Sequence, residues 1–327
     1  MKKSLDQKLA QIRAGKYTPQ DFIIADAKDA DIGFGTAAPG LDRTKPGRLY
    51  PREVYLERMR AMTRSGLVDI MLMSASTCER LSEEGLFKDS PVTPAIRLND
   101  TTDIWSARGG RYKEEQSRHH RTARIDQAKK YTDLGLYSIT FSNEVDIDAE
   151  NAEAYSAFRA EAAEHGMRHF LEVFNPAFDI HLAEGGDIGS FINDNIVRTL
   201  AGVMKTDQPQ FLKQQYNGPR AMEELASYDP GHLIPGVLGG ARGTTRDTFE
   251  LVAQASKYGA RVALFGRKVN LAEDSLALVR LMRAVVQGET KPDEAVRAYH
   301  DQLAKAKVKP DRPLAEDILI TDPVLKG

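Results

Sequence analysis

The feature that most constrains this chain is a repeated alternation of short apolar segments with longer amphipathic ones. Eight short runs have the composition of β-strands, at residues 22–25, 68–73, 94–98, 137–141, 169–174, 200–204, 233–238 and 261–265. Enough chain lies between successive runs for a loop and a helix. Alternation of this kind predicts a parallel sheet covered by helices, and eight repeats favour a closed (β/α)8 barrel over an open sheet.

Amphipathic segments between the runs predict helices at residues 51–65, 114–134, 152–165, 220–228 and 245–258. Thr245 is the expected N-cap of the last of these helices, with Asp247 in its first turn. Two further helices are expected near residues 5–13 and 291–305, outside the barrel core.

The sequence lacks a linker rich in Pro, Gly or Ser, so we expect one domain over residues 1–327. Its barrel core spans about residues 21–287, and a C-terminal extension spans about residues 288–327. The last stretch, residues 309–327, contains three prolines and is expected to be an extended arm. Two sites remain open for this arm, the barrel itself or a partner subunit of a homo-oligomer.

Composition narrows the class of partner. The 45 basic and 47 acidic residues give a net charge of −2, which argues against a sequence-independent nucleic-acid binder. The chain has no apolar run of membrane-spanning length, and its first fifteen residues lack the apolar segment of a signal peptide. With Cys78 as the only cysteine, no intramolecular disulfide can form. We therefore expect a cytoplasmic protein without a membrane or nucleic-acid partner.

Lys205 is the main candidate for a reactive group. Catalytic residues of a barrel lie where its strands end, and Lys205 directly follows the sixth apolar run. Burial lowers the pKa of a lysine and leaves more free amine, which attacks a carbonyl to form an imine. The alternative is a lysine just past the strand that reaches solvent.

Glu172 lies among apolar residues in the fifth run. A buried carboxylate needs a partner, and a lysine that points into the barrel would be suitable. A glutamate beside a lysine also suits general acid–base catalysis. The alternative is a purely structural ion pair.

Asp26 and Lys28 follow the first run and share a face of that strand because they are two positions apart. Asp26 is expected to orient the amine of Lys205 and to accept protons. Lys28 is either a rival imine-forming lysine or the partner of Asp29 or Asp31 in a loop salt bridge.

Glycine-rich turns follow the seventh and eighth runs, with Gly239 and Gly240 in the first and Gly266 and Arg267 in the second. Glycines let backbone N–H groups approach an anion, and arginine adds a forked cationic donor. Loops after strands seven and eight are the usual phosphate site of such barrels. These four residues therefore predict a phosphate-binding site.

Arg97 is another cation at a strand end. It binds a substrate oxygen or a second phosphate, or it pairs with Asp100. The seven histidines show no spacing typical of a metal site, and the glycine pattern of a dinucleotide-binding fold is absent. We therefore expect neither a metal nor a cofactor.

From about residue 21 to residue 287, the order of strand-end residues resembles class I aldolases of the tagatose-1,6-bisphosphate type and archaeal-type fructose-bisphosphate aldolases. The resemblance implies reversible, metal-independent aldol cleavage of a phosphorylated ketose through a Schiff base. Matched to that family are an aspartate after strand one (Asp26), a glutamate on strand five (Glu172), the Schiff-base lysine on strand six (Lys205), small residues after strand seven (Gly239, Gly240) and a phosphate-binding pair after strand eight (Gly266, Arg267).

The chain also departs from that family. The tagatose type has a second lysine on strand four, where this chain has residues 138–141 without a lysine. The aromatic proton donor of the archaeal type is not evident on strand five, although Phe174 lies nearby. Two alternatives therefore stay open, a transferase that uses imine chemistry on a related sugar phosphate, and a non-catalytic barrel that senses a sugar phosphate.

Overall fold

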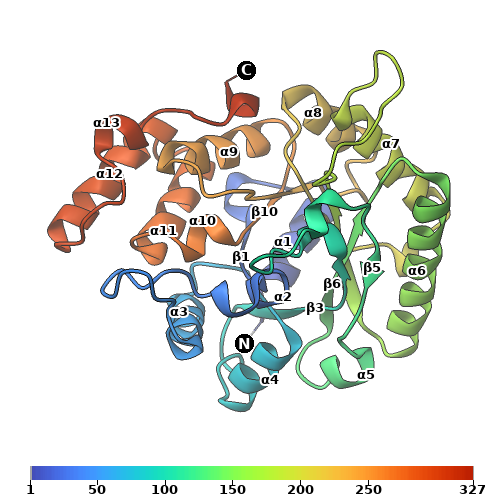
Figure 1. The fold of residues 1–327 in the computed structure, drawn as a ribbon, viewed down its shortest axis with the longest axis horizontal. Helices are drawn as coiled ribbons and strands as arrows, with labels where there is room; N and C mark the ends of the chain where they lie inside the picture. Colours follow the sequence, from blue (N-terminus) through green and yellow to red (C-terminus); the bar gives the residue numbers. More distant parts are fainter. Residues whose placement is uncertain (1, 327) are drawn as a thin grey trace.

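The computed structural model describes residues 2–326 and contains a closed barrel of eight parallel strands (Figure 1). Around the barrel the strands follow the order β1-β10-β9-β8-β7-β6-β3-β2, and β1 pairs in parallel with β10 to close the seam. The predicted (β/α)8 barrel is confirmed. Its strands are β1 (Ile23–Lys28), β2 (Ile70–Met73), β3 (Thr93–Arg97), β6 (Leu134–Thr140), β7 (Arg168–Phe174), β8 (Leu212–Gln214), β9 (Gly236–Leu238) and β10 (Val262–Phe265).

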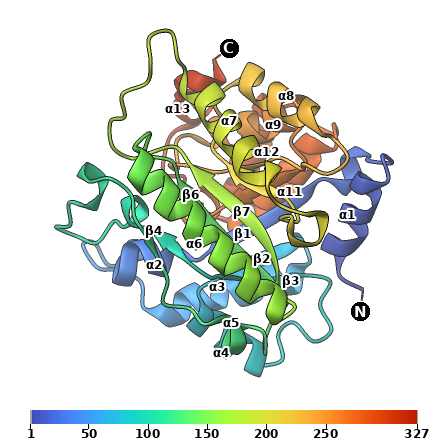
Figure 2. The same cartoon turned by 90° about the vertical axis from the view of Figure 1, so that its right-hand side faces the viewer.

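Helices follow the strands and form the outer layer, as Figure 2 shows for α6 lying over β6 and β7. The helices predicted at residues 51–65, 152–165 and 220–228 are confirmed as α3, α6 and α8. Along the chain the larger helices of this layer are α3 (Arg52–Ser65), α4 (Ala75–Glu83), α6 (Val145–Glu164), α7 (Ile188–Ala201), α8 (Pro219–Tyr228), α9 (Thr245–Lys257) and α11 (Ser275–Val286). Short helices α2 (Ala30–Phe34) and α10 (Arg267–Asn270) follow β1 and β10.

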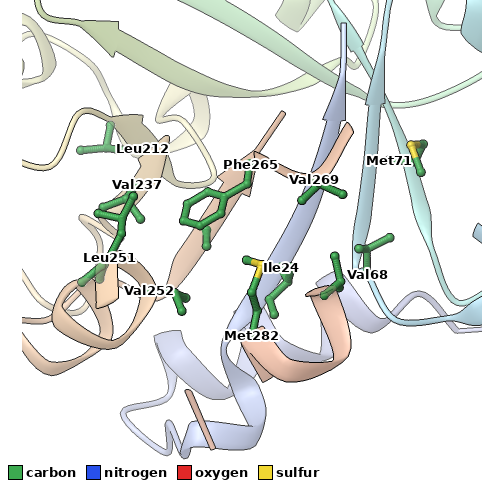
Figure 3. Packing of buried hydrophobic residues seen from close by; sticks show 14 of the residues in the cluster. Ile24, Val68, Met71, Leu212, Val237, Leu251, Val252, Phe265, Val269 and Met282 are labelled. Atoms are coloured by element: carbon green, nitrogen blue, oxygen red, sulfur yellow. The ribbon is translucent and has the colours of Figure 1, made fainter. Parts of the chain in front are cut away.

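Alternating side chains of each strand divide the apolar core into two parts. Ile23 and Ala25 belong to a cluster inside the barrel. Ile24, between them, belongs to a larger cluster between the strands and the helices. Figure 3 shows this outer cluster, where Ile24 lies near Met282 of α11. The strands are therefore buried on both faces, which explains why most of their residues are apolar.

The predicted N-terminal helix is confirmed as α1 (Ser4–Arg13). Its buried residues Leu5, Leu9 and Ile12 belong to the cluster inside the barrel, so α1 covers the end of the barrel where the strands begin. Lys8 Nζ donates to Asp69 Oδ2 at 2.9 Å, which ties the helix to the start of β2.

The predicted C-terminal helix is confirmed as α12 (Pro292–Lys305). The segment after it packs on the barrel's own helix α9, where the Thr321 amide donates to Asp247 Oδ1 at 2.7 Å. Of the two binding sites considered for the C-terminal arm, the structure shows that the arm packs on the barrel. The arm is less extended than expected, since it contains helix α13 (Leu314–Asp317) and a 3-10 turn, η6 (Pro323–Leu325).

The prediction of a strand at residues 200–204 is wrong. Residues 200 and 201 are the last two residues of α7, and residues 202–204 belong to the loop after it. Buried Ile192, Ile196 and Leu200 recur every four residues, which is the apolar face of a helix. The sixth barrel strand is β8, which begins at Leu212.

The predicted helix at residues 114–134 is also wrong. The segment contains a 3-10 turn, η4 (Tyr112–Glu114), the short strand β5 (His119–His120) and one helical turn, α5 (Ile125–Ala128). β5 pairs antiparallel with β4 (Asp100–Thr101). Residues 114–124 contain almost no apolar side chain, so a helix there would have no face to bury.

The N-cap of helix α9 lies one residue before the predicted one. Thr244 is the N-cap, because its Oγ1 accepts from the Asp247 amide at 3.0 Å. Asp247 Oδ2 accepts from the Thr244 amide at 2.9 Å in return, which completes a capping box.

Candidate active site

A cavity of about 350 Å³ lies at the end of the barrel where the strands finish. Six residues that the sequence analysis predicted for the site line this cavity, together with residues that were not predicted. Its predicted lining residues are Arg97, Glu172, Gly239, Gly240, Gly266 and Arg267, and its further polar residues include Asp29, Asp103 and Lys213.

Three polar side chains form a row across neighbouring strands. The register places Ser138 of β6 beside Glu172 of β7, and Glu172 beside Lys213 of β8. Residues in register on adjacent parallel strands point to the same side of the sheet, and Glu172 and Lys213 both line the cavity. All three are buried. The strand pairing therefore holds an amine and a carboxylate next to each other inside the barrel.

Arg97 connects this row to β1. Its Nη2 donates to Glu172 Oε2 at 2.7 Å and its Nη1 donates to Ser138 Oγ at 2.6 Å. Its Nε donates to Asp29 Oδ2 at 2.6 Å. Of the partners considered from sequence, Asp100 does not hydrogen-bond to Arg97 in the structure.

Glu172 is held between two cations. Its Oε2 accepts from Arg97 and from Ser138 Oγ, the latter at 2.8 Å, while its Oε1 forms an ion pair with Lys213 Nζ. Asp29, Glu172, Arg97 and Lys213 together supply two negative and two positive charges. Balanced pairing of this kind is what buried charges require.

Asp29 stays ionised in this network. Burial alone would raise the pKa of its carboxyl group, but the charges of Arg97 and Lys213 outweigh burial and lower that pKa. Burial alone would lower the pKa of Arg97, but the carboxylates of Asp29 and Glu172 outweigh burial and raise that pKa. The arginine is therefore a permanent cation that fixes Glu172 and Asp29.

The prediction that Lys205 ends the sixth strand is wrong. Lys205 is exposed and begins a 3-10 turn, η5 (Lys205–Asp207), in the loop that leads into β8. It therefore lies at the opposite end of the strand from the cavity, and it lines a separate pocket with Arg13 and His232. The lysine of the sixth strand is Lys213.

The predicted roles of Asp26 and Lys28 are also wrong. The two side chains share a face of β1, as expected, and they pair at 2.9 Å. That face is turned toward the helices, because Ala27 and Asp29 of the alternate face line the cavity. Burial raises the pKa of Asp26 and lowers that of Lys28. The carboxylate that reaches the site from this part of the chain is Asp29.

The glycine turns lie at the cavity as predicted, and two of their glycines are required by geometry. Gly240 has a φ of 64°, which favours glycine. A Cβ on Gly266 would lie 2.8 Å from the carbonyl oxygen of Ala27. The Arg267 guanidinium lies over the ring of Phe34, with its Cζ 5.7 Å from the ring centroid, and this side chain has no hydrogen bond or ion pair with any other residue from 2 to 326. The turns therefore present a cation without a hydrogen-bonding partner beside backbone that lines the cavity.

Sequence reasoning missed several polar residues of the cavity, among them Asp29, Asp103 and Lys213. Asp29 continues the inward alternation of Ala25 and Ala27, and this signal was available. Lys213 follows only two apolar residues, since β8 has three residues. Asp103 lies on a 3-10 turn, η3 (Thr102–Ile104), for which the sequence contains no regular pattern.

Two further findings concern the chain from residue 2 to residue 326. No group of three or more histidine, cysteine, aspartate or glutamate side chains is arranged there to bind a metal ion. No helix within that range combines the length and the hydrophobicity needed to cross a membrane.

Comparison with known proteins gives a likeness in structure. No protein-family model matches the chain, and no curated protein matches it. Among solved structures, an archaeal fructose 1,6-bisphosphate aldolase is 16% identical with a TM-score of 0.59, over 87% of this chain and 99% of that one. A Schiff-base-forming fructose-1,6-bisphosphate aldolase is 18% identical with a TM-score of 0.59, over 86% and 99%. The fold is that of these aldolases. An archaeal aldolase solved with its catalytic lysine bound to the carbinolamine intermediate is 17% identical, with the same TM-score and coverage of 86% and 99%.

Proposed function

We propose that this chain is an aldolase-type lyase that cleaves a phosphorylated ketose through a Schiff base on Lys213. The observation that carries the proposal is the buried Lys213 amine, which lines the cavity beside Glu172 on the sixth strand. The fold shared with Schiff-base-forming aldolases supports it.

The pairing of Lys213 with Glu172 explains how the amine becomes reactive. Glu172 Oε1 takes a proton from the Lys213 ammonium, and the neutral amine attacks the carbonyl carbon of the ketose. Protonated Glu172 returns this proton to the carbinolamine hydroxyl group, which leaves as water and gives a protonated imine that withdraws electrons from the adjacent carbon. Arg97 and Ser138 stay bonded to Glu172 Oε2, so the carboxylate keeps its orientation while its other oxygen moves the proton.

The glycine turns supply the second half of substrate binding. Arg267 and Lys113 are the cations at the cavity whose side chains have no hydrogen bond or ion pair with another residue from 2 to 326, and Arg267 directly follows Gly266 of the second glycine turn. A phosphate group fits such a site because it accepts hydrogen bonds from backbone N–H groups and from a forked guanidinium. We therefore assign the substrate phosphate to Gly239, Gly240, Gly266 and Arg267.

Borohydride trapping tests the proposal. The protein is incubated with dihydroxyacetone phosphate, reduced, and digested, and the masses of the peptides are read. We expect a stable adduct on Lys213 and none in Lys213→Met. Lys205→Met is the matched control, since Lys205 is exposed and distant from the cavity, and it should form the adduct at the wild-type level.

Other outcomes identify the competing functions. An adduct on a different lysine would refute the assignment of the Schiff base to Lys213. Binding of the phosphate compound without any adduct would favour the sugar-phosphate-sensing barrel. An adduct that transfers its carbon unit to an added acceptor aldehyde, without net cleavage of a ketose, would favour a transferase.

A further inference from the structure

Asp103 is a buried carboxylate in the cavity that has no cationic partner among the described residues. It is 1% exposed and lies on η3. Its hydrogen-bond donors are the Ser117 hydroxyl at 2.7 Å, the Thr140 hydroxyl at 3.1 Å to Oδ1, and the Ala177 amide at 3.4 Å. Asp29 and Glu172, the other carboxylates of the cavity, are both bonded to Arg97.

The two oxygens of Asp103 are not equally well bonded. Oδ1 accepts the short bond from Ser117, whereas Oδ2 has only contacts of 3.3 Å to Thr140 and 3.4 Å to Ala177. Good hydrogen bonds are about 2.7–3.2 Å long, so Oδ2 retains accepting capacity. A carboxylate buried with incomplete bonding is costly. A hydrogen-bond donor on a molecule bound in the cavity would complete the hydrogen bonding of Oδ2.

Thr140 fixes where this carboxylate lies in the barrel. It is the last residue of β6, and Asp103 accepts its hydroxyl hydrogen bond beyond the end of that strand. Ser138 lies two residues earlier on the same face and belongs to the row with Glu172 and Lys213. Asp103 is therefore one layer above the reactive amine, at the height that a substrate attached to Lys213 would occupy.

We propose that Asp103 is the acid–base group for the carbon–carbon bond. This inference rests on the proposed function, because it needs the imine on Lys213. It assigns to Asp103 the proton transfers that follow imine formation, while Glu172 serves the amine itself. The two carboxylates divide the work because one is fixed to cations and the other is not.

The chemistry balances without a further reactant. Asp103 removes the proton from the hydroxyl group of the carbon that leaves, and that oxygen becomes the aldehyde carbonyl. The carbon–carbon bond breaks, and its electron pair forms the enamine and neutralises the imine nitrogen. After the aldehyde departs, protonated Asp103 returns the proton to the enamine carbon. Water then hydrolyses the imine and releases the ketone and the Lys213 amine.

A proton-exchange experiment tests this role without requiring the natural aldehyde. Dihydroxyacetone phosphate is incubated with the protein in D₂O, and the loss of its carbon-bound proton next to the carbonyl is followed by NMR. Borohydride trapping is measured in parallel. For Asp103→Asn we expect adduct formation on Lys213 within about twofold of wild type and exchange slower by roughly 10²-fold or more.

Two control variants separate a catalytic role from a structural one. Ser117→Ala removes the best hydrogen bond to Asp103 but leaves the carboxylate, and it should exchange at a rate within about tenfold of wild type. Asp103→Glu should recover part of the exchange that Asp103→Asn loses. Wild-type exchange in Asp103→Asn would overturn the inference, and so would loss of trapping in both Asp103→Asn and Asp103→Glu. Absence of an adduct in wild-type protein would instead refute the proposed function.

Discussion

Lys213 and Glu172 show how little separates a structural ion pair from a catalytic one. Both side chains are buried and in register, and Glu172 would be satisfied by Arg97 and Ser138 alone. Its second oxygen is thereby free to serve the amine. In the proposed mechanism the arginine makes the difference, because it keeps the carboxylate oriented while the Lys213 amine is converted to an imine.

His169 makes the stability of the protein depend on pH. It lies on β7, and its Nε2 is 2.8 Å from the Tyr155 hydroxyl of α6. Burial, with a smaller contribution from the charge of Arg159, lowers the pKa of His169 from 6.5 to about 3. Below pH 6.5, His169 binds a proton in the unfolded chain but stays neutral in the folded protein. The free energy of unfolding therefore falls as the pH falls toward 3.

We expect this residue to remove about 2 kcal/mol of stability between pH 7 and pH 5, since each pH unit below 6.5 contributes about 1.4 kcal/mol. Urea unfolding of the wild type and of His169→Gln at pH 7 and pH 5 measures this loss of stability. The wild type should lose about 2 kcal/mol more than the variant over this interval. Equal losses in the two proteins would show that His169 titrates normally.

At the scale of elements, the sequence predicted strands well where both faces are apolar and failed where the barrel interior is polar. Residues 200–204 resembled a buried strand because the last turn of an amphipathic helix and its loop placed apolar residues together. β8 was missed because its inward residue is Lys213 and the strand has only three residues. Lys213, to which we assign the imine, interrupts the apolar pattern that would have located its strand.

The site was predictable in its loops and less so in its strands. Gly239, Gly240, Gly266 and Arg267 lie at the cavity because the position of a loop depends only on which strands precede it. Asp26 and Lys28 were misplaced because an error of one residue in alternation moves a side chain to the opposite face. Asp103 depends on contacts with Ser117 and Thr140, which lie far from it in sequence.

Asp247 connects two elements and should affect both. It accepts from the Thr244 amide at the start of α9 and from the Thr321 and Asp322 amides of the C-terminal arm. Asp247→Ala leaves these donors without an acceptor, and we expect a loss of roughly 2–3 kcal/mol. We also expect faster tryptic cleavage in the arm.

Urea unfolding and a time course of trypsin digestion check this expectation. Asp301→Ala is the matched control, because Asp301 is an exposed acidic residue of α12 without a hydrogen bond to the arm. It should change stability by less than about 0.5 kcal/mol. An arm equally resistant in both variants would mean that Asp247 does not hold it.

At the scale of the whole molecule, α1 closes the barrel at the end opposite the cavity. Leu9 is 2% exposed and packs with the residues inside the barrel. Leu9→Ala should therefore lower the free energy of unfolding by about 2–5 kcal/mol, which is the usual cost of replacing a buried leucine by alanine. The exposed residue Gln7 on the same helix is the control, and Gln7→Ala should be nearly neutral.

Urea unfolding measures both variants, and borohydride trapping at low temperature shows whether the cavity survives. We expect Leu9→Ala to keep its adduct on Lys213 while the fold persists, since the two ends of the barrel are separate. A change below about 1 kcal/mol in Leu9→Ala would show that α1 contributes little to the interior.

The seam between β1 and β10 has a consequence for the order of events during synthesis and refolding. β1 pairs with β10 over Ile23↔Val262 to Asp26↔Phe265, so the ring joins segments more than two hundred residues apart. Contacts of such high sequence separation form late, because the loop-closure entropy is paid before they contribute. Asp29 comes from the first strand and Arg267 follows the last, so a nascent chain has no complete site until β10 has left the ribosome. Regain of activity should therefore lag behind regain of helical circular dichroism when the denatured protein refolds.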